Sequence, residues 1–389
     1  MSKEPKVSVL VPTFNRAQFL PQALDSLLGQ TRPPDEIIVV DDGSTDETRK
    51  LLQRYKSRVQ VLTRANGGKS AALNQGLEHA TGDCIWFFDD DDVALPEALE
   101  RHLHALQEHP EAGFSLSPGL IGDTDPSSGR IVPRPMQPMP APFDANSLLA
   151  YILVASPFPY FLQGGIVRRR CVDSAGGFDP ELLRSQDYGF LVQLARRFPV
   201  IKLKDHTYLH RQGSHDRGPM NLLHSAAERS HHWVRYGRIL WMKWKPQLDL
   251  MDHLPKDTNG CRQLFTAENR RDARVCRCAA LYFKGIWGEL LEELDRAFED
   301  FPPGEPCGQF ASMIWVNAIL RLRAPLYLEL DGTPIWQSLR HKLKGPAAAY
   351  LGALMVHAFT LMRNNATTEQ PSLKSAQIAR MLKDLTTGV

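Results

Sequence analysis

Acidic side chains follow two apolar stretches in the first quarter of the chain. Asp41 and Asp42 come directly after the run Glu36–Val40, and the four aspartates Asp89–Asp92 come directly after Cys84–Phe88. Four adjacent carboxylates repel one another, and a divalent cation or hydrogen-bond donors would relieve that repulsion. Carboxylate oxygens are hard ligands that favour Mg²⁺ or Mn²⁺. A divalent metal site is therefore expected here, the alternative being a solvated acid cluster that caps the next helix.

Alternating strand and helix signals surround these acids. Strands are expected at Val7–Val11, Glu36–Val40, Val59–Leu62 and Cys84–Phe88, and helices at Ala17–Leu28, Asp46–Tyr55, Lys69–His79 and Leu95–Gln107. Strands that alternate with helices of roughly 10 to 13 residues predict a parallel sheet covered on both faces. Ligands of such sheets bind beyond the carboxyl ends of the strands, so the acids are expected to converge on one edge.

The middle and the end of the chain have a different texture. Residues 120–143 are rich in proline and glycine, which predicts a loop-rich insertion with a hairpin around Ser127–Gly129. Periodic order returns at Gln163–Val167, Tyr188–Arg197 and Val200–Leu203. Beyond Arg217 the pattern is helical, with a helical hairpin over Ala267–Phe301. We expect an α/β domain over residues 1–219 and an all-α region of unknown role over residues 220–389.

Composition narrows the class of protein. The 389 residues are 43% hydrophobic and 23% charged, as in ordinary globular proteins, and the net charge of +2 argues against a nucleic-acid partner. Six cysteines in a chain of this length do not make a disulfide framework. The start is not a signal peptide, and the apolar stretch Ala347–Met362 is shorter than the roughly 20 residues of a membrane span. We expect a cytoplasmic protein, with peripheral contact at the inner membrane face left open.

Several phosphate-binding motifs are missing. Gly68-Lys69-Ser70 resembles the end of a P-loop, but Thr63 stands where the first glycine belongs, and no G-x-G-x-x-G occurs. A P-loop NTPase and a Rossmann dehydrogenase are therefore disfavoured. The glycine-rich loop of sugar nucleotidylyltransferases is absent as well.

Four ordered segments resemble family 2 glycosyltransferases of the GT-A fold. They read VSVLVPTFNR, EIIVVDDGSTDET, NGGKSAALNQGLEHATGD and IWFFDDDDVALPEAL, all within residues 7–99, and a weaker match continues to about residue 217. The resemblance implies a Rossmann-like nucleotide-sugar-binding domain with a mostly parallel mixed sheet. It also implies inverting transfer from a nucleotide-sugar donor, with a UDP-sugar expected, assisted by Mg²⁺ or Mn²⁺.

The resemblance also implies which residues bind the donor. Asp42 would accept a hydrogen bond from the uracil ring, and Lys69 would approach the phosphates. Asp89 or Asp90 would contact the ribose, and Arg211 could pair with phosphate oxygens. The donor-binding set as a whole is Pro12, Thr13, Asn15, Asp41, Asp42, Lys69, Asp89, Asp90 and Arg211.

Metal, base and acceptor positions follow from the same resemblance. Asp91 would bind the metal that bridges the diphosphate, and His215 or His210 could complete the site. Asp187 would deprotonate the acceptor hydroxyl, although an ordinary helix-capping role is the alternative. The acceptor side would be lined by Gln163, Gly164 and Gly165.

The main expectation is an inverting glycosyltransferase in glycan, polysaccharide or glycoconjugate synthesis. Its acceptor would be a saccharide, a lipid-linked saccharide or a protein, and a homodimer stays open. The first alternative is a non-catalytic sugar-nucleotide-binding or scaffold protein that acts through its helical region. A second is nucleotidyl transfer to a sugar phosphate. The released product separates the three, because a glycosyltransferase releases UDP, a scaffold protein releases nothing and a nucleotidyltransferase releases pyrophosphate.

Overall fold

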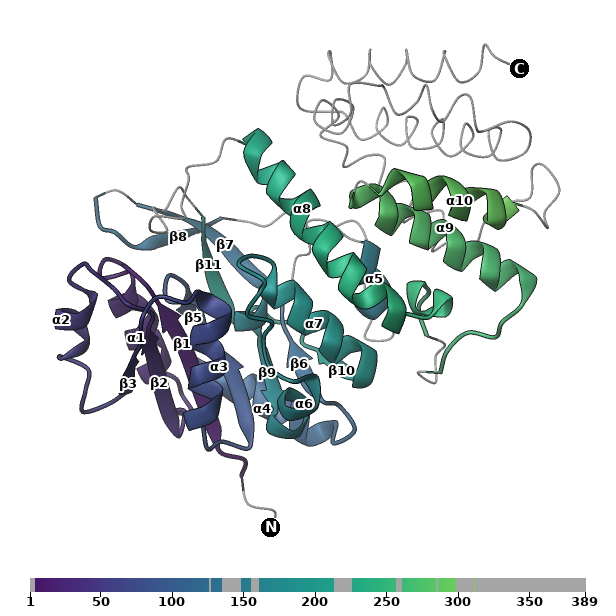
Figure 1. Ribbon diagram of the computed structural model, residues 1–389. Helices are drawn as coiled ribbons and strands as arrows, with labels where there is room; N and C mark the ends of the chain where they lie inside the picture. The colour runs from purple at the N-terminus through teal and green to yellow at the C-terminus, as the bar shows by residue number, and fades with distance from the viewer. Residues whose placement is uncertain are drawn as a thin grey trace. The chain divides into compact units, whose positions relative to one another are not determined.

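The chain divides into two compact units, each described here by itself. The structure, a computed structural model, describes residues 4–125, 127–134, 148–154, 161–212, 226–256, 261–284, 286–298 and 311 (Figure 1). The first unit comprises residues 1–145 and 158–224, and the second comprises residues 146–157 and 225–389. The sequence predicts one boundary near residue 220, whereas in the structure residues 146–157 also cluster with the helical unit.

A seven-stranded sheet forms the centre of the first unit. Its strands, in spatial order, are β10 (Val200–Lys202), β6 (Phe114–Leu116), β9 (Gly165–Arg168), β4 (Cys84–Phe87), β1 (Val7–Thr13), β2 (Glu36–Asp41) and β3 (Gln60–Thr63). Strand β9 runs antiparallel to both β4 and β6, and the other pairs are parallel. The mostly parallel mixed sheet expected from the sequence is confirmed.

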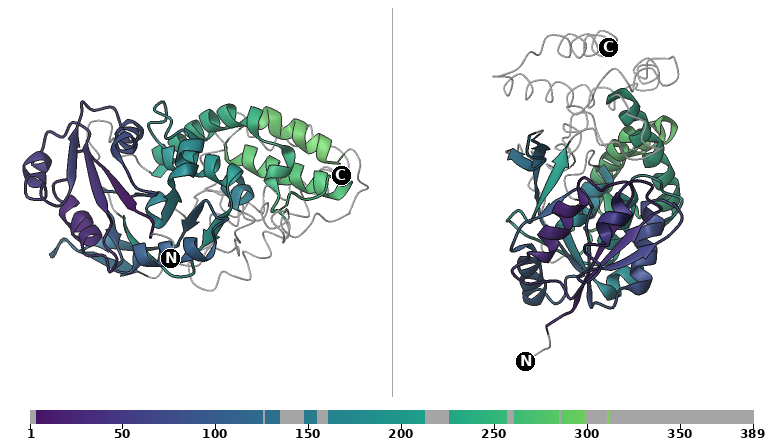
Figure 2. Two further views of the ribbon diagram at one scale, coloured as in Figure 1. Left: turned by 90° about the horizontal axis from the view of Figure 1, so that it is seen from below. Right: turned by 90° about the vertical axis from the view of Figure 1, so that its left-hand side faces the viewer.

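Helices cover this sheet on both faces (Figure 2). They are α1 (Leu20–Leu28), α2 (Thr48–Leu52), α3 (Lys69–His79), α4 (Ala98–Glu108), α6 (Arg169–Ala175) and α7 (Gln186–Arg197). All seven residues of β1 are buried, and alternate side chains face opposite layers. Val9 belongs to the same core cluster as Leu24 of α1, whereas Leu10 packs beside Gly76 of α3. Helices α1 and α3 therefore lie on opposite faces of β1.

A smaller sheet of four strands stands beside the acidic segment. Its order is β5 (Val93–Ala94), β11 (Tyr208–Gln212), β7 (Gly119–Thr124) and β8 (Ile131–Arg134). The turn between β7 and β8 is closed by the Asp125 amide, which donates to the Arg130 carbonyl at 2.8 Å. This is the hairpin expected around Ser127–Gly129. Because β5 directly follows Asp92 and pairs with β11, the late strand β11 is held against the end of the acidic segment.

The second unit is helical throughout its described part. It contains α5 (Leu148–Val154), α8 (Ala226–Trp244), the 3₁₀ turns η3 (Lys245–Gln247) and η4 (Leu250–His253), α9 (Ala267–Phe283) and α10 (Trp287–Phe298). Helices α9 and α10 form the hairpin expected from the sequence. The core of the second unit includes the fully buried side chains of Trp241 on α8 and Cys276 on α9. Within the described ranges, no helix has both the length and the apolar character needed to cross a bilayer.

A buried lysine ties three helices of this unit together. The ammonium of Lys284 donates to the Leu153 carbonyl of α5 at 2.9 Å and to the Ala280 carbonyl of α9 at 3.4 Å. It also lies 5.7 Å from the centre of the Trp241 ring on α8. Burial lowers the pKa of Lys284 to about 7.

The unfolding free energy of this unit should therefore increase as the pH rises above 7. Below pH 7 the folded and unfolded states both hold the proton, whereas between the folded pKa of about 7 and the ordinary value of 10.5 only the unfolded state does. The expected gain is on the order of a few kcal/mol. Urea unfolding from pH 6 to pH 10 would measure it, and Lys284→Met should flatten the profile. An equally steep profile in that variant would contradict this origin.

Candidate functional site

The carboxyl ends of β1, β2 and β4 meet at one edge of the large sheet. Pro12 and Thr13 are the last residues of β1, and Thr13 stands beside Asp41 in the register of β1 and β2. The Asp42 amide donates to the Thr13 carbonyl at 2.9 Å, which extends this pairing by one residue. Strand β4 lies on the other side of β1, so the segment that follows it reaches the same edge. The convergence expected from the strand pattern is present.

Two side chains hold the loop that follows β2. The carboxylate of Asp41 is fully buried and accepts hydrogen bonds from the Ser44 amide at 2.8 Å and from Arg49 Nε at 3.0 Å. Asn15 has a positive φ of 53°, a conformation that asparagine tolerates better than most residues. Its Oδ1 accepts from the Thr45 amide at 2.8 Å. Asp41 and Asn15 thus fix the conformation of the loop after β2 through hydrogen bonds within the protein.

Asp42 anchors the loop that leads into α3. Its carboxylate accepts hydrogen bonds from the amides of Gly67 at 3.0 Å and Gly68 at 2.7 Å. Arg64 Nε lies 3.1 Å from the same carboxylate. Burial raises the pKa of Asp42 although these donors oppose the shift. Gly68 has a φ of 88°, so this tight entry into the helix depends on glycine.

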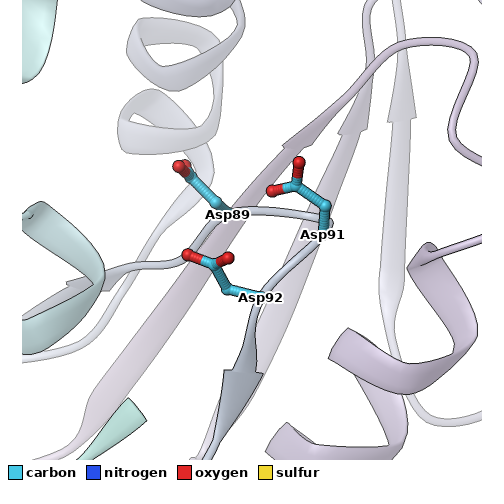
Figure 3. A group of neighbouring side chains, drawn as sticks. All are labelled: Asp89, Asp91 and Asp92. Atoms are coloured by element: carbon cyan, nitrogen blue, oxygen red, sulfur yellow. The ribbon is translucent and has the colours of Figure 1, made fainter. Parts of the chain in front are cut away.

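The acidic turn, defined as Asp89–Asp92, groups its carboxylates within a small volume. One oxygen from each of Asp89, Asp91 and Asp92 lies within 4.8 Å of the others, and Figure 3 shows all three on the turn after β4. Burial and the charge of Asp91 together raise the pKa of Asp90 to about 7. Such a concentration of buried negative charge calls for cationic partners.

Asp92 is the structural member of the acidic turn. Its carboxylate is fully buried and accepts from Gln163 Nε2 at 2.5 Å and from the Arg211 amide at 2.9 Å. His210 Nδ1 lies 3.1 Å from the same carboxylate. These donors come from β11 and from the turn η2 (Leu162–Gly164), so one aspartate joins three distant parts of the first unit.

Asp92→Asn should accordingly lower the unfolding free energy of the first unit by about 1–3 kcal/mol, because an amide cannot accept from all three buried donors. Denaturant unfolding followed by tryptophan fluorescence would measure the loss. Asp123→Asn, on the exposed side of β7, is the matched control with the same chemical change. Equal stability of the two variants would show that Asp92 does not hold these segments.

Arg16 is a cation of this site that the sequence analysis did not single out. It is 7% exposed, and its guanidinium lies 3.7 Å from Asp90 and 3.8 Å from Asp91. Its amide donates to Thr48 Oγ1 at 3.0 Å, which fixes the backbone between β1 and α1. The available signal was its position, since it directly follows the segment Pro12–Asn15 at the end of the first strand.

Lys69 links the acidic turn to Asp187. Its Nζ lies 2.6 Å from Asp89 Oδ1 and 3.1 Å from Asp187 Oδ2, although Asp187 is 118 residues away in the chain. Burial lowers the pKa of the Lys69 ammonium, but the charges of Asp187 and Asp89 outweigh it and hold the pKa above its ordinary value. A charged lysine thus bridges two carboxylates that the sequence assigns to different tasks.

Helix α3 also positions the segment before Asp187. The Asn74 amide group donates to the Phe178 carbonyl and accepts from the Phe178 amide, both at 2.8 Å. Ser70 Oγ donates to the Leu182 carbonyl at 3.2 Å. Ser185 then takes a φ of 61° just before α7 begins, which is an uncommon backbone conformation for serine. Asp187 therefore lies in the first turn of α7, presented toward the residue that begins α3.

The predicted acceptor side is closely packed. Gln163 is 1% exposed, and its carbonyl accepts from Trp86 Nε1 at 2.8 Å. The Gly164 carbonyl accepts from the Ser117 amide at 2.7 Å, and a Cβ at Gly164 would collide with the Tyr208 ring. Gly165 begins β9. These residues bring η2 against the acidic turn through the Gln163–Asp92 contact.

Arg211 is buried and fully surrounded by protein acceptors. Its guanidinium donates to the Asp91 carbonyl at 2.8 Å, to Thr124 Oγ1 at 2.8 Å and to Gln22 Oε1 at 2.7 Å. It also stacks over Phe19, 4.7 Å from the ring centre. In this structure its contacts hold the backbone of the acidic turn. His215, expected as a metal ligand, lies outside the described residues.

The donor set of the acidic turn fits a divalent cation. The three grouped carboxylates supply the hard oxygen ligands that Mg²⁺ and Mn²⁺ prefer. Asp92 is taken up by its three protein donors, and His210 beside it is stacked on Phe161 with ring centres 4.7 Å apart. Asp91 and Asp89 are therefore the carboxylates suited to hold a metal.

Comparison with known proteins agrees with this geometry. The model of glycosyl transferase family 2 matches residues 8–152, which contain β1 to β8 and the acidic turn. Residues 8–152 are thus similar to glycosyltransferase family 2. The resemblance inferred from the four motifs is thereby confirmed.

Known glycosyltransferases match part of this chain. An uncharacterized glycosyltransferase of Nostoc sp. is 37% identical over 124 residues, covering 31% of this chain and 38% of the relative. The putative teichuronic acid biosynthesis glycosyltransferase TuaG of Bacillus subtilis is 37% identical over 121 residues, covering 29% of this chain and 48% of that protein. The matches thus span less than half the length of these relatives.

One solved structure resembles nearly the whole chain. It is S. aureus TarS 1-349 in complex with UDP-GlcNAc, with a TM-score of 0.51, 19% identity and coverage of 95% of both chains. At this identity the likeness concerns the fold. Together with the family match, it confirms the α/β glycosyltransferase fold expected from the sequence.

Proposed function

We propose that this protein transfers a sugar from a nucleotide-sugar donor to an acceptor hydroxyl with inversion at the anomeric carbon. The observation that carries this proposal is the contact of one ammonium, that of Lys69, with both Asp89 and Asp187. It brings an expected base and an expected donor site within reach of each other. A UDP-sugar is the proposed donor. The complex of TarS with UDP-GlcNAc makes that nucleotide sugar the first to test.

In the proposed reaction, Asp187 acts as the base. The acceptor hydroxyl oxygen forms a bond to the anomeric carbon, and its proton passes to the Asp187 carboxylate. The bond between that carbon and the diphosphate oxygen breaks, and its electron pair leaves with the nucleoside diphosphate. A single displacement inverts the configuration and needs one base and no protein nucleophile.

Asp91 and Asp89 would hold the divalent cation. A bound Mg²⁺ or Mn²⁺ supplies Lewis-acid stabilisation of the charge on the leaving diphosphate. Arg16 would add positive charge from the protein on the same side of the turn, since its guanidinium already lies near Asp90 and Asp91.

Lys69 has two tasks in this proposal. Its charge keeps Asp187 in the carboxylate form that a base requires. The same ammonium blocks that carboxylate from an acceptor proton as long as the two remain in contact. A donor diphosphate would compete for Lys69, so donor binding would free the base. This predicts that the donor binds before the acceptor.

The deciding experiment is titration calorimetry of UDP and GDP into the full chain, with Mn²⁺ and with a chelator. Metal-dependent UDP binding is the expected result, and release of UDP from a panel of UDP-sugars would then identify the donor. Absence of nucleotide binding with any metal would favour the non-catalytic scaffold instead. Pyrophosphate release from a nucleotide and a sugar phosphate would favour nucleotidyl transfer.

The acceptor is proposed to be a saccharide, a lipid-linked saccharide or a protein hydroxyl. A hydroxyl acceptor suits a single carboxylate base, because the attack of the hydroxyl releases one proton and one carboxylate can accept it. Arrays of immobilised glycans probed with a labelled donor would separate saccharide acceptors from the other two.

A further inference from the structure

A charged pocket lies within the helical second unit. Its volume is about 270 Å³, and it is lined by residues of η3, η4, α9 and α10. Four of the lining side chains are cationic and three are acidic, so the pocket has an excess of one positive charge. None of these residues takes part in the proposed reaction.

The inner carboxylates of this pocket are already neutralised by close partners. Glu289 lies 2.8 Å from Lys245 Nζ and also accepts from Trp241 Nε1 at 3.4 Å. Glu293 is 5% exposed and lies 2.7 Å from Arg274. The charges of Lys245 and Arg274 are therefore paired with those of Glu289 and Glu293.

The remaining charged groups of the pocket are two arginines and one rim glutamate. Arg296 is half exposed and lies 3.9 Å from Glu292, whose side chain is exposed as well, and 4.0 Å from Glu293. Such exposed, long ion pairs hold each other weakly. Both side chains are therefore available to rearrange around a ligand.

Of the four cationic side chains that line the pocket, Arg277 is the one without an acidic partner among the described residues. Its guanidinium lies 5.4 Å from the centre of the Trp241 ring, and its Nε is buried without a hydrogen-bond acceptor. A buried donor without an acceptor is rare in folded proteins, because its loss of solvation is not compensated. An acceptor supplied by a ligand would satisfy it.

We propose that this pocket binds a phosphate group, with Arg277 as its principal ligand and Arg296 at the rim. The planar guanidinium donates two parallel hydrogen bonds to oxyanions of this shape. A phosphomonoester presents three strong acceptor oxygens and can accept from both arginines at once, whereas a carboxylate presents only two oxygens. The volume is just below the range of about 300–1,000 Å³ typical of small-molecule sites, which favours a single phosphate group over a whole nucleotide sugar.

The test is calorimetric titration of inorganic phosphate into the full chain and two variants. Arg277→Met removes the guanidinium but keeps apolar contact with Trp241, and at least a tenfold loss of affinity is expected. Arg270→Met removes the same charge from α9 at a position outside the pocket and should bind like the wild type. Arg277→Lys keeps the positive charge but loses the planar guanidinium, and its affinity for phosphate should lie between those of the wild type and Arg277→Met. Equal affinity of all four proteins, or no binding by the wild type, would overturn the proposal.

Two further arms separate possible sources of the phosphate. Saturation with UDP and Mn²⁺ should leave phosphate binding unchanged, and its loss would move the anion to the donor site and overturn the proposal. Vesicles containing phosphatidylglycerol test a lipid headgroup. Sedimentation with vesicles that is lost in Arg277→Met would assign the site to lipid, and phosphate binding without vesicle binding would assign it to a soluble phosphate. Thermal unfolding of each variant confirms that it is folded.

Discussion

Asp187→Asn should slow sugar transfer by about 10²–10⁴-fold while nucleotide binding stays close to that of the wild type. The amide has nearly the same shape as the carboxylate but cannot take a proton from the acceptor hydroxyl. The alternative role of Asp187, as an acid in the first turn of α7, acts through the helix dipole, which accounts for about 1 kcal/mol of stability at most. A large rate loss in a folded protein therefore separates the two roles.

The measurement is UDP release in the presence of acceptor, together with the KM for the donor and the midpoint of thermal unfolding. Glu181→Gln makes the same carboxylate-to-amide change at an exposed position of the loop before α7 and serves as the control. Retained turnover in Asp187→Asn would mean that another group removes the proton. An unfolding midpoint that falls without a rate loss would make Asp187 a helix-stabilising residue.

Asp91→Asn should abolish the metal dependence of nucleotide binding and reduce turnover by about 10²-fold or more. The reason is that Asp91 belongs to the grouped carboxylates of the acidic turn, whereas the carboxylate of Asp92 is held by three protein donors. Stability should hold or rise, because the charge of Asp91 helps to raise the pKa of Asp90 to about 7, and removing that charge relieves the repulsion.

Calorimetry with UDP at several Mn²⁺ concentrations gives the first readout and denaturant unfolding the second. The pair of outcomes distinguishes Asp91 from its neighbour, since Asp92→Asn is expected to lose stability. A wild-type response to Mn²⁺ in Asp91→Asn would exclude Asp91 as a ligand. A large loss of stability in Asp91→Asn would show that its main role is structural.

Elements with a strong local pattern could be predicted from the sequence. The helix expected at Lys69–His79 has those bounds in the structure, because Gly68 fixes its start and the residues before Gly82 end it. The strand expected at Glu36–Val40 is one residue longer, since Asp41 still pairs with Thr13. The first helix begins at Leu20 instead of Ala17, because Arg16 to Phe19 form a separate turn.

Features that depend on distant partners could not be predicted. Strand β9 has an ordinary apolar pattern that carries no information about its antiparallel direction between β4 and β6. Strand β11 reads YLHRQ, a largely polar sequence for which no strand is predicted, and it is a strand because β5 and β7 supply its hydrogen bonds. Arg16 was overlooked because its partners, Asp90 and Asp91, lie more than seventy residues away.

The strand order has a consequence for how the chain folds during synthesis. The family-matching segment ends at residue 152, yet β9, which separates β6 from β4, begins only at Gly165. A ribosome that has released residues 8–152 has produced β6 without the neighbour that joins it to the rest of the sheet. The contacts of the acidic turn form later still, because the Arg211 amide and His210 can reach Asp92 only after β11 has left the ribosome. Recombinant fragments that end at residue 152 should therefore aggregate. A fragment that folds should extend at least through β11.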